Sequence, residues 1–374
     1  MIRTYRYPLH PTVAQEAVLL GWLGQCCDLY NAALQERRDA WKKQRVSIGL
    51  YGQYKGLTEW RQSDTDGAAV PAWVQRSALA RVDRAFKAFF RRCKSGAKPG
   101  FPRFRKKRRY DSFSVPWETG SGGARLSGSR LSLPKLPGIK VHLYRPLRGT
   151  PLQVTVRREP DGKWSVSFVC ELGAASPLVA PDRVVGIDLG LKSLVVTSDG
   201  EVIENPRPAA RGAAKLARAQ RVLARRKKGS RSRERARIQV ARAHRHVANQ
   251  RLDHARKTAA SLVGRYDVIA HEDLRIADMS RGLFSKGIND VGWGLLLHCI
   301  ASKAESAGKR VVAVDPRGTS QRCSGCGAVV PKDLRTRVHD CPHCGLRLDR
   351  DHNAAVNIQA LGRSAVSQPP ALAA

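Results

Sequence analysis

The segment RVVGIDLGLKSLVVTSDGEVI, residues 183–203, decides the fold of the C-terminal half of the chain. A short apolar run reaches Asp188, and a second apolar run starts at Leu194. The second run is followed by Asp199-Gly200, a dipeptide typical of tight turns between antiparallel strands. The segment therefore predicts strand, turn, strand, with an acidic side chain near the end of the first strand.

The residues that follow add further strand and helix patterns. Residues 267–270, Asp-Val-Ile-Ala, are a predicted buried strand that ends in His271-Glu272-Asp273. Apolar residues recur at helical spacing in residues 293–307, and residues 310–314 read as another strand. Strands that alternate with helices are typical of α/β folds, so we expect an α/β domain in this half.

The sequence of the N-terminal half predicts a helical unit and a β-sheet unit. Residues 1–10 alternate like a strand, and Thr12 to Gln15 forms a capping box at the start of a helix. Two amphipathic helices make residues 12–93 a small helical unit. Strand patterns in residues 95–175, including a hairpin around Asp161-Gly162, indicate a small β-barrel or sandwich that the N-terminal strand completes.

Length and composition limit the functional class. The chain has 374 residues and a formal net charge of +36, which predicts two or three domains and a polyanionic partner such as nucleic acid. The alternative is a solvated basic surface. No apolar stretch approaches the roughly 20 residues of a membrane span, so a membrane protein is excluded. The N-terminus lacks the pattern of a secretory signal, and we expect a cytoplasmic protein.

Two basic tracts are candidates for nucleic-acid contact. Residues 91–109 contain ten basic residues and no acidic one, and residues 207–257 contain 18 basic residues against two acids. The second tract predicts a helical hairpin that Gly229-Ser230 divides. Phe101 and Phe104 lie in the first tract and either stack on bases or pack in a turn. The residues expected to contact phosphates are Arg103, Arg105, Lys106, Lys107, Arg225, Arg226, Lys227 and Lys228.

Four of the nine cysteines have the spacing of a metal site. They occur in two Cys-x-x-Cys pairs, each followed by a glycine, with fourteen residues between the pairs. The predicted ligands are Cys323, Cys326, Cys341 and Cys344. Four thiolates leave no open position on a tetrahedral ion, so we expect structural zinc. His343 is not expected to be a ligand, and Cys26, Cys27, Cys93, Cys170 and Cys299 are predicted core residues.

Three carboxylates form a second constellation. Asp188 and Glu272 end predicted strands, and Asp351 lies at the start of a helix just after the cysteines. Each alone is more often a turn or helix-capping residue. Together they match what phosphodiester hydrolysis requires: carboxylates that hold two magnesium ions roughly 4 Å apart, one activating water and one stabilising the leaving oxygen.

The motifs resemble one known family over nearly the whole chain. GIDLGLKSLVVTSDG, HEDLRIADM, DPRGTSQRCSGCG and HDCPHCGLRLDRDHNAAVNI are similar to the TnpB (OrfB) proteins of insertion sequences, which are relatives of type V CRISPR effectors. The resemblance implies a RuvC-like nuclease of RNase H fold with an inserted zinc ribbon, a β-barrel wedge domain and a small helical recognition domain. It also implies a guide RNA from the transposon end and cleavage of target DNA beside a short motif.

The resemblance implies the catalytic residues Asp188, Glu272 and Asp351, with Asp349 as a competitor for the last position. A catalytically silent transposon regulator and an autonomous strand-transfer transposase are the alternatives, and a monomer is favoured. The implied domains are a wedge domain at 1–11 and 94–180, a recognition domain at 12–93, a nuclease domain at 181–318 and 350–362, a zinc ribbon at 319–349 and a disordered tail at 363–374.

Overall fold

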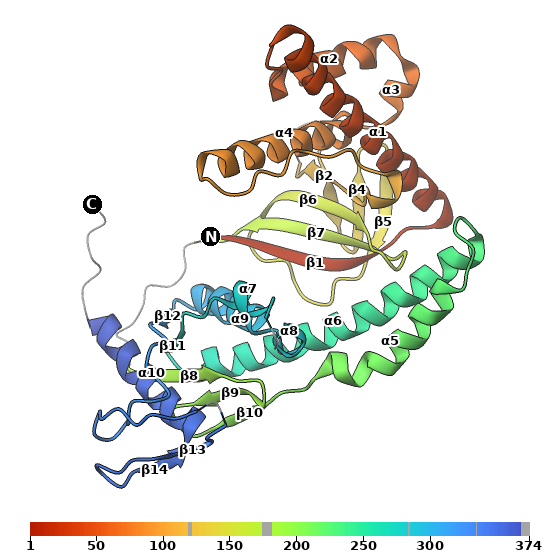
Figure 1. The fold of residues 1–374 in the computed structure, drawn as a ribbon. Coiled ribbons are helices and arrows are strands. Elements are labelled where there is room, and N and C mark those ends of the chain that lie inside the picture. Colours follow the sequence, from red (N-terminus) through yellow and green to blue (C-terminus); the bar gives the residue numbers. More distant parts are fainter. Residues whose placement is uncertain (119–121, 174–181, 283–284, 334, 368–374) are drawn as a thin grey trace. The chain divides into compact units, whose positions relative to one another are not determined.

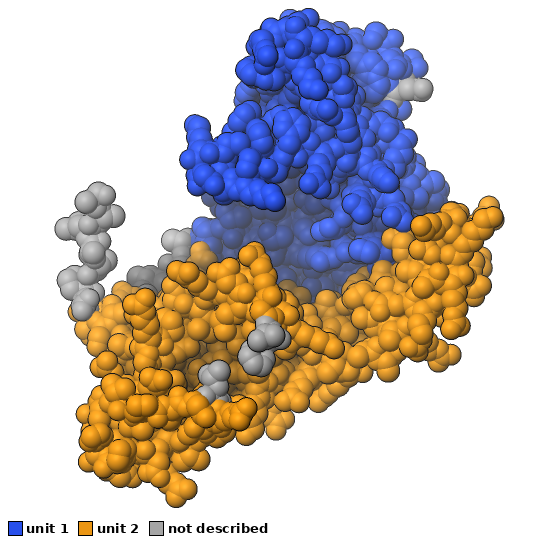
Figure 2. Space-filling model, viewed as in Figure 1, with its two compact units in different colours: residues 1–174 blue, residues 175–374 orange. Residues whose placement is uncertain are grey.

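The computed structural model describes residues 1–118, 122–173, 182–282, 285–333 and 335–367. The chain divides into two compact units, Met1–Ala174 and Ala175–Ala374, which Figure 2 shows in separate colours. Each unit has its own hydrophobic core. Among the helices of the described ranges, none is both long and apolar enough to cross a membrane.

The first unit contains one seven-stranded sheet, in the order β2-β6-β7-β1-β5-β4-β3 (Figure 1). The strands are β1 (Ile2–His10), β2 (Ser112–Pro116), β3 (Arg125–Ser127), β4 (Arg130–Leu133), β5 (Leu136–Val141), β6 (Thr150–Arg158) and β7 (Trp164–Glu171). The N-terminal strand β1 pairs with β7 and β5, as predicted. A bridge between Trp117 and Ala124 connects the two edges, so the sheet curls on itself.

Helices cover this sheet. They are α1 (Val13–Gln44), α2 (Leu50–Ser63), α3 (Thr65–Ala69) and α4 (Ala72–Lys94). The predicted capping box at Thr12 is confirmed, because its side chain accepts from the Gln15 amide and Gln15 accepts from the Thr12 amide. Helices α2 and α3 were not predicted, since α2 buries two side chains, Gln53 and Leu57, and its apolar periodicity is weak.

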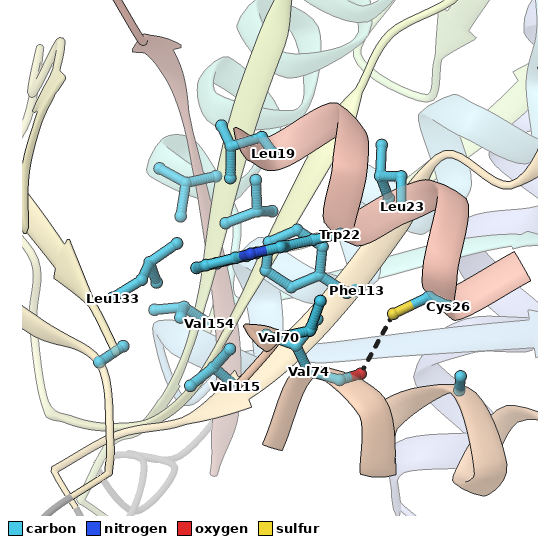
Figure 3. Packing of buried hydrophobic residues seen from close by; sticks show 14 of the residues in the cluster. Leu19, Trp22, Leu23, Cys26, Val70, Val74, Phe113, Val115, Leu133 and Val154 are labelled. Carbon is cyan, nitrogen blue, oxygen red and sulfur yellow. Dashed lines mark hydrogen bonds between the residues drawn. The ribbon is translucent and has the colours of Figure 1, made fainter. Parts of the chain in front are cut away.

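The core of the first unit joins helix to sheet around Trp22. Its ring packs edge to face on Phe113 of β2, with ring centroids 5.7 Å apart (Figure 3). The Cys26 thiol lies in the same core and donates to the Val74 carbonyl of α4 at 3.4 Å. Cys26, Cys27, Cys170 and Cys299 are buried as predicted, whereas Cys93, on the last turn of α4, is exposed, so its prediction as a core residue was wrong.

The second unit contains a five-stranded sheet in the order β10-β9-β8-β11-β12. Its strands are β8 (Val184–Leu189), β9 (Ser193–Thr197), β10 (Val202–Glu204), β11 (Val268–Glu272) and β12 (Arg310–Val314). Strands β8, β11 and β12 are parallel, and the β8-β9 and β9-β10 pairs are antiparallel. The strand-turn-strand prediction for residues 183–203 is therefore confirmed.

In the described part of this unit, six helices and a small hairpin accompany the sheet. The helices are α5 (Pro208–Ala224), α6 (Arg231–Arg265), α7 (Ile276–Met279), α8 (Ser285–Val291), α9 (Trp293–Ser306) and α10 (Arg350–Ser367), and the hairpin is β13 (Val338–Asp340) with β14 (Arg347–Asp349). Helices α5 and α6 form the predicted hairpin, and Ser230 caps α6 through the Arg233 amide. Residues 363–367 are helical, which corrects the predicted disordered tail there; residues 368–374 lie outside the described ranges.

The sheet of the second unit has two different faces. Val185 and Ile187 pack with apolar residues of α6 and α9 in the larger core cluster. The alternate residue Gly186 faces α10, where an added Cβ would lie 2.1 Å from the Ala355 carbonyl oxygen. At Gly362 of α10 an added Cβ would lie 2.4 Å from the Ala270 Cβ. Helix α10 therefore lies directly on β8 and β11, with its backbone close to theirs.

Candidate active site and metal centre

Strand geometry places Asp188 and Glu272 side by side. Successive side chains of a strand point to opposite faces, so Asp188 shares the face of Gly186, and Glu272 shares that of Ala270. Helix α10 packs against the sheet at Gly186 and Ala270. Parallel pairing sets Gly186 beside Ala270 and Ile187 beside His271, so the next residues along the two strands are Asp188 and Glu272. The structure thus brings two predicted site residues together at the carboxyl end of the sheet.

The third carboxylate, Asp351, lies in the first turn of α10, four residues before Ala355 and therefore on the same helix face. Asp349, the other candidate for the third carboxylate, caps the N-terminus of this helix. The Asp349 side chain accepts from the amides of Asp351 at 2.8 Å and His352 at 3.3 Å, which is the geometry of a helix N-cap. Asp349 is exposed, while the side chain of Asp351 is 16% exposed.

The environment of the three carboxylates changes the pKa of Asp188 most. Burial, together with the negative charges of Glu272 and Asp351, raises the pKa of Asp188 to about 8. Arg350 and the Leu189 amide act in the opposite direction and do not offset this increase. Burial also raises the pKa of Glu272. A bound cation would relieve this repulsion, and carboxylate oxygens are the ligands that Mg²⁺ prefers.

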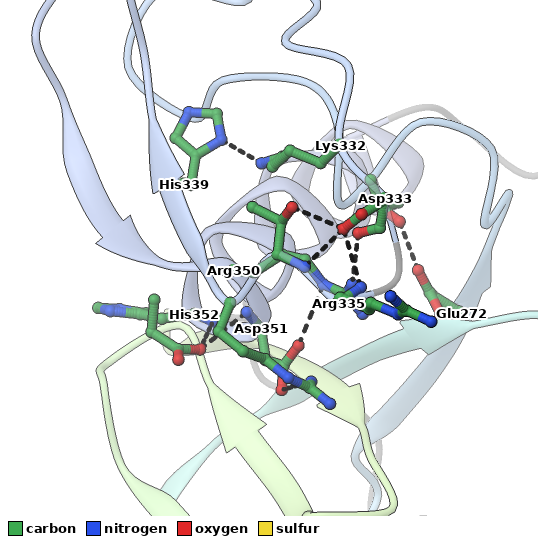
Figure 4. Close-up of polar contacts among 12 residues, drawn as sticks. Glu272, Lys332, Asp333, Arg335, His339, Arg350, Asp351 and His352 are labelled. Carbon is green, nitrogen blue, oxygen red and sulfur yellow. Dashed lines mark hydrogen bonds and ion pairs between the residues drawn. The ribbon is translucent and has the colours of Figure 1, made fainter.

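Neighbouring side chains contact two of the carboxylates, Glu272 and Asp351 (Figure 4). The Thr319 hydroxyl donates to Glu272 in a short hydrogen bond, which lowers the pKa of Glu272 and partly counteracts burial. Asp351 lies 3.5 Å from Arg350 Nε and 3.9 Å from an Arg337 nitrogen. The two guanidinium groups place positive charge beside Asp351 and so offset part of the negative charge at the site.

Helix α10 also binds the beginning of the cysteine segment. Asn353 is fully buried; its side chain accepts from the Ser324 amide at 3.0 Å and donates to the Arg322 carbonyl at 2.8 Å. Asn357 donates to the carbonyls of Thr319 at 2.8 Å and Arg322 at 2.7 Å. One helix therefore carries Asp351, anchors the residue that contacts Glu272, and fixes the first cysteine turn.

The four predicted cysteine ligands form a compact group. All four sulfur atoms lie within 4.8 Å of one another, and both the Cys323–Cys344 and Cys326–Cys341 pairs are 3.6 Å apart. A tetrahedral zinc ion with Zn–S bonds of about 2.3 Å separates its sulfur ligands by about 3.8 Å. Among the described residues, no other set of three or more histidine, cysteine or acidic side chains lies as close together, and His343 is not in the group.

The two cysteine turns repeat one geometry. Gly327 donates to the Cys323 carbonyl, and Gly345 donates to the Cys341 carbonyl, both at 2.9 Å. Both glycines have φ values near the left-handed region, +78° and +73°, which explains the glycine after each pair. The donor set and spacing fit a metal ion that prefers thiolates.

Sequence reasoning missed several residues that complete the two sites. Thr319, Asn353 and Asn357 contact partners 29 or more residues away. Lys332 contacts the buried His339 (Figure 4). A threonine before a Cys-x-x-Cys pair carries no distinctive signal. Asn353, two residues after Asp351, was quoted in the family motif, but the motif does not predict that its side chain is buried or that it makes two hydrogen bonds.

All eight residues predicted to contact phosphates are exposed. Lys107 pairs with Asp28 at 2.8 Å, and the Arg105 guanidinium lies 5.7 Å from the centre of the Tyr30 ring. Phe101 packs edge to face on Phe86 and Phe89 but remains 47% exposed. The packing interpretation of Phe101 is therefore confirmed, and stacking on bases stays a prediction.

Sequence comparisons place the chain among transposon-encoded proteins. Residues 167–282 match the OrfB_IS605 family, described as probable transposase, and residues 293–358 match the Cas12f1-like TNB domain. Residues 1–45 match a family described as a helix-turn-helix domain. In this chain those residues form β1 and one continuous helix, α1, in place of two helices.

Two full-length relatives carry the name "putative RNA-guided DNA endonuclease". The relative from Streptomyces pristinaespiralis is 33% identical over 97% of this chain and 90% of its own length. The Escherichia coli (strain K12) relative, InsQ, is 29% identical over 98% of this chain and 94% of its own length. A shorter match, 43% identical over 16% of the chain, is the CRISPR-associated endodeoxyribonuclease Cas12f1 of Sulfoacidibacillus thermotolerans.

The fold resembles that of Cas12f1. The cryo-EM structure of a Cas12f1–sgRNA–target DNA complex matches with a TM-score of 0.61 and 14% identity, over 96% of this chain and 98% of that one. The chain therefore has a mixed α/β fold that resembles Cas12f1, with a four-cysteine group that could hold a metal ion. The chain belongs to the TnpB (OrfB) family, as the full-length relatives show.

Proposed function

We propose that this protein is a transposon-encoded RNA-guided DNA endonuclease. The names of its full-length relatives and the Cas12f1 complex with guide RNA and target DNA support this function. The observation that carries the proposal is the convergence of Asp188, Glu272 and Asp351 from β8, β11 and α10, with a raised pKa at Asp188. A regulator without catalysis would have no need to maintain this unfavourable cluster of buried charge.

Magnesium is the cofactor that the donor set fits, and Asp188, Glu272 and Asp351 would hold it. When bound, it would activate water and stabilise the leaving oxygen of a phosphodiester. Thr319 would orient Glu272, and Arg337 and Arg350 would keep Asp351 in place. We interpret the surrounding α/β unit as a RuvC-like nuclease domain at residues 181–318 and 350–362.

The cysteine segment has a different role in this proposal. Cys323, Cys326, Cys341 and Cys344 would bind one structural zinc ion in a ribbon at residues 319–349, because four thiolates leave no position for water or substrate. The curled sheet would be the wedge domain, at residues 1–11 and 94–180, and residues 12–93 the recognition domain. These assignments follow from the family resemblance and the element boundaries.

Specificity would come from a guide RNA. The surplus of positive charge supplies affinity for phosphates but carries no sequence information. The exposed residues at 103–107 and 225–228 would contact the guide or its heteroduplex with target DNA. Base pairing would then select the target, and the protein would read a short adjacent motif.

The test uses the full-length protein with its co-purified RNA and a plasmid library that carries the guide-matched site beside a randomised motif. The wild type is expected to cut in magnesium, and Glu272→Gln is expected to be inactive while it retains RNA. Asp273→Asn is the matched control, because Asp273 is the adjacent residue and is exposed. Cleavage by Glu272→Gln, or equal cleavage after RNase treatment, would contradict the proposal.

A further inference from the structure

The first unit contains a cavity of about 420 Å³ that the proposed cleavage site does not use. It lies between the C-terminal part of α1, residues 46–48 that follow it, α4 and Phe101. This volume is in the range of pockets that hold small organic groups, about 300–1,000 Å³. Aromatic rings line it: Trp41 on α1, Phe86, Phe89 and Phe90 on α4, and Phe101.

The rings form a fixed platform. Phe101 packs edge to face on Phe86 and Phe89, with centroids 5.6 and 5.3 Å apart. Phe86 also stacks with Phe90 at 6.2 Å, and the Arg37 guanidinium lies 5.3 Å from the centre of Phe86. Mutual packing of this kind holds ring orientations without a bound ligand.

The same rings remain accessible. Trp41 is 53% exposed, Phe90 is 56% exposed and Phe101 is 47% exposed. A contiguous patch of exposed aromatic surface usually marks a binding site. Isolated exposed apolar residues would need no explanation, but here the three lie around one cavity.

The charge around the cavity selects the class of ligand. Arg38 and Lys42 line it, as does Arg37, whose charge is balanced by an ion pair with Asp83 at 3.4 Å, and no acidic residue is among the described lining residues. The last turns of α1 and α4 add Lys43, Arg91, Arg92 and Lys94. Helix C-termini carry about half a negative charge each, so these cations outweigh the two helix ends that lie here. An apolar peptide would gain little from such a rim, whereas a nucleotide offers an aromatic face and a phosphate together.

We propose that this aromatic pocket, lined by Trp41, Phe86, Phe89, Phe90 and Phe101, binds an unpaired nucleobase of single-stranded nucleic acid. The base stacks on the exposed rings while Arg38 and Lys42 contact the adjoining phosphates. The proposal rests on the nucleic-acid binding in the proposed function, but it does not depend on cleavage, guide choice or metal.

The test measures binding of labelled oligouridylate and oligothymidylate to the full-length protein, freed of co-purified nucleic acid by RNase and high salt. A strand of equal length without bases provides the same phosphates and no stacking surface. Phe101→Ala and Trp41→Ala are expected to weaken binding of the base-containing strands about 5- to 150-fold, as one lost base–aromatic stack predicts. Binding of the abasic strand is expected to be unchanged, and Phe101→Trp is expected to retain affinity.

Phe104→Ala is the matched control. Phe104 is also 47% exposed and lies three residues from Phe101, but its ring is covered by Arg38 and does not line the cavity. Equal loss of affinity for the abasic strand, or no loss in either pocket variant, would overturn the proposal. A change of oligomeric state in the pocket variants without a base-dependent loss would also overturn it, since a second chain would then occupy the pocket. If wild-type protein bound neither strand, the proposed function itself would fail.

Discussion

The four-cysteine group and the three-carboxylate group occupy the same unit but are built in opposite ways. The cysteines come from two turns, and in each turn the amide of the following glycine donates to the carbonyl of the first cysteine. The four sulfur atoms lie within 4.8 Å of one another. The carboxylates come from β8, β11 and α10, and burial together with their mutual repulsion raises the pKa of Asp188. Ligands that come from adjacent turns can surround an ion completely and leave no position for water, which suits a structural site. Carboxylates that separate strands and a helix bring together keep like charges close to one another and leave room for a substrate.

The sharpest test of this comparison is at the start of α10. Asp351→Asn is expected to reduce cleavage by about 1,000-fold or more, because it removes one charged ligand from the open site. Asp349→Asn is expected to keep most activity, since asparagine also caps helices well. Rates of plasmid cleavage by the two full-length variants measure the difference. Equal losses would mean that α10 placement, and not ligand chemistry, determines activity.

The closed site is expected to respond in stability. Cys341→Ser should reduce bound zinc from about one ion per chain to nearly none and lower the unfolding temperature by about 5 °C or more. Cys93→Ser is the control, because Cys93 is exposed and lies in the first unit. Elemental analysis and thermal unfolding measure both effects. Full zinc content and unchanged stability in Cys341→Ser would show that these thiols are not its ligands.

The contact between Thr319 and Glu272 tests how the open site is oriented. Thr319→Val removes the hydroxyl that donates to Glu272, and such supporting contacts are worth about 10- to 100-fold in metal affinity or activity. The expected result is a higher magnesium concentration for half-maximal cleavage, with RNA retention unchanged. Thr319→Ser keeps the hydroxyl and should restore the wild-type magnesium dependence. A valine variant with wild-type magnesium dependence would leave Thr319 without a positioning role.

The last test concerns the effect of pH in the absence of metal. The folded-state pKa of Asp188 is about 8, above the value of about 3.9 in an unfolded chain. The folded state therefore binds more protons in this interval, and its stability is expected to fall by about 1.4 kcal/mol per pH unit as pH rises. Above pH 8 this contribution levels off.

Asp188→Asn cannot ionise, so it should lack this component of the pH dependence. Urea unfolding in the presence of a chelator, at several pH values between 4 and 9, measures the slope of both proteins. Identical slopes would mean that burial and carboxylate repulsion do not raise the pKa of Asp188 in the folded state.

The two sites also differ in how far sequence could predict them. The cysteine ligands follow from spacing alone, because both turns are local. Asp188 and Glu272 were found as acidic residues at strand ends, but their proximity depends on the parallel pairing of β8 with β11. The choice between Asp349 and Asp351 needs the cap geometry, since the two are separated by one residue.

Other elements could not be predicted for the same physical reason. Thr319 contacts Glu272 across 47 positions, and Asn353 contacts Ser324 across 29. Such contacts exist after the chain has folded and leave no periodic signal. The aromatic pocket is similar: Phe101 was quoted in a basic tract, but its packing with α4 comes from tertiary structure.

The close approach of α10 to the sheet affects how a mutational scan of this protein would read. An added Cβ at Gly186 would lie 2.1 Å from the Ala355 carbonyl, and one at Gly362 would lie 2.4 Å from the Ala270 Cβ. Any substitution at these glycines must lift the helix that carries Asp351. Both positions would therefore score as intolerant, like catalytic residues, although neither has a side chain that can take part in chemistry. Gly362 lies eleven residues from Asp351, so loss of activity there would report the position of a helix.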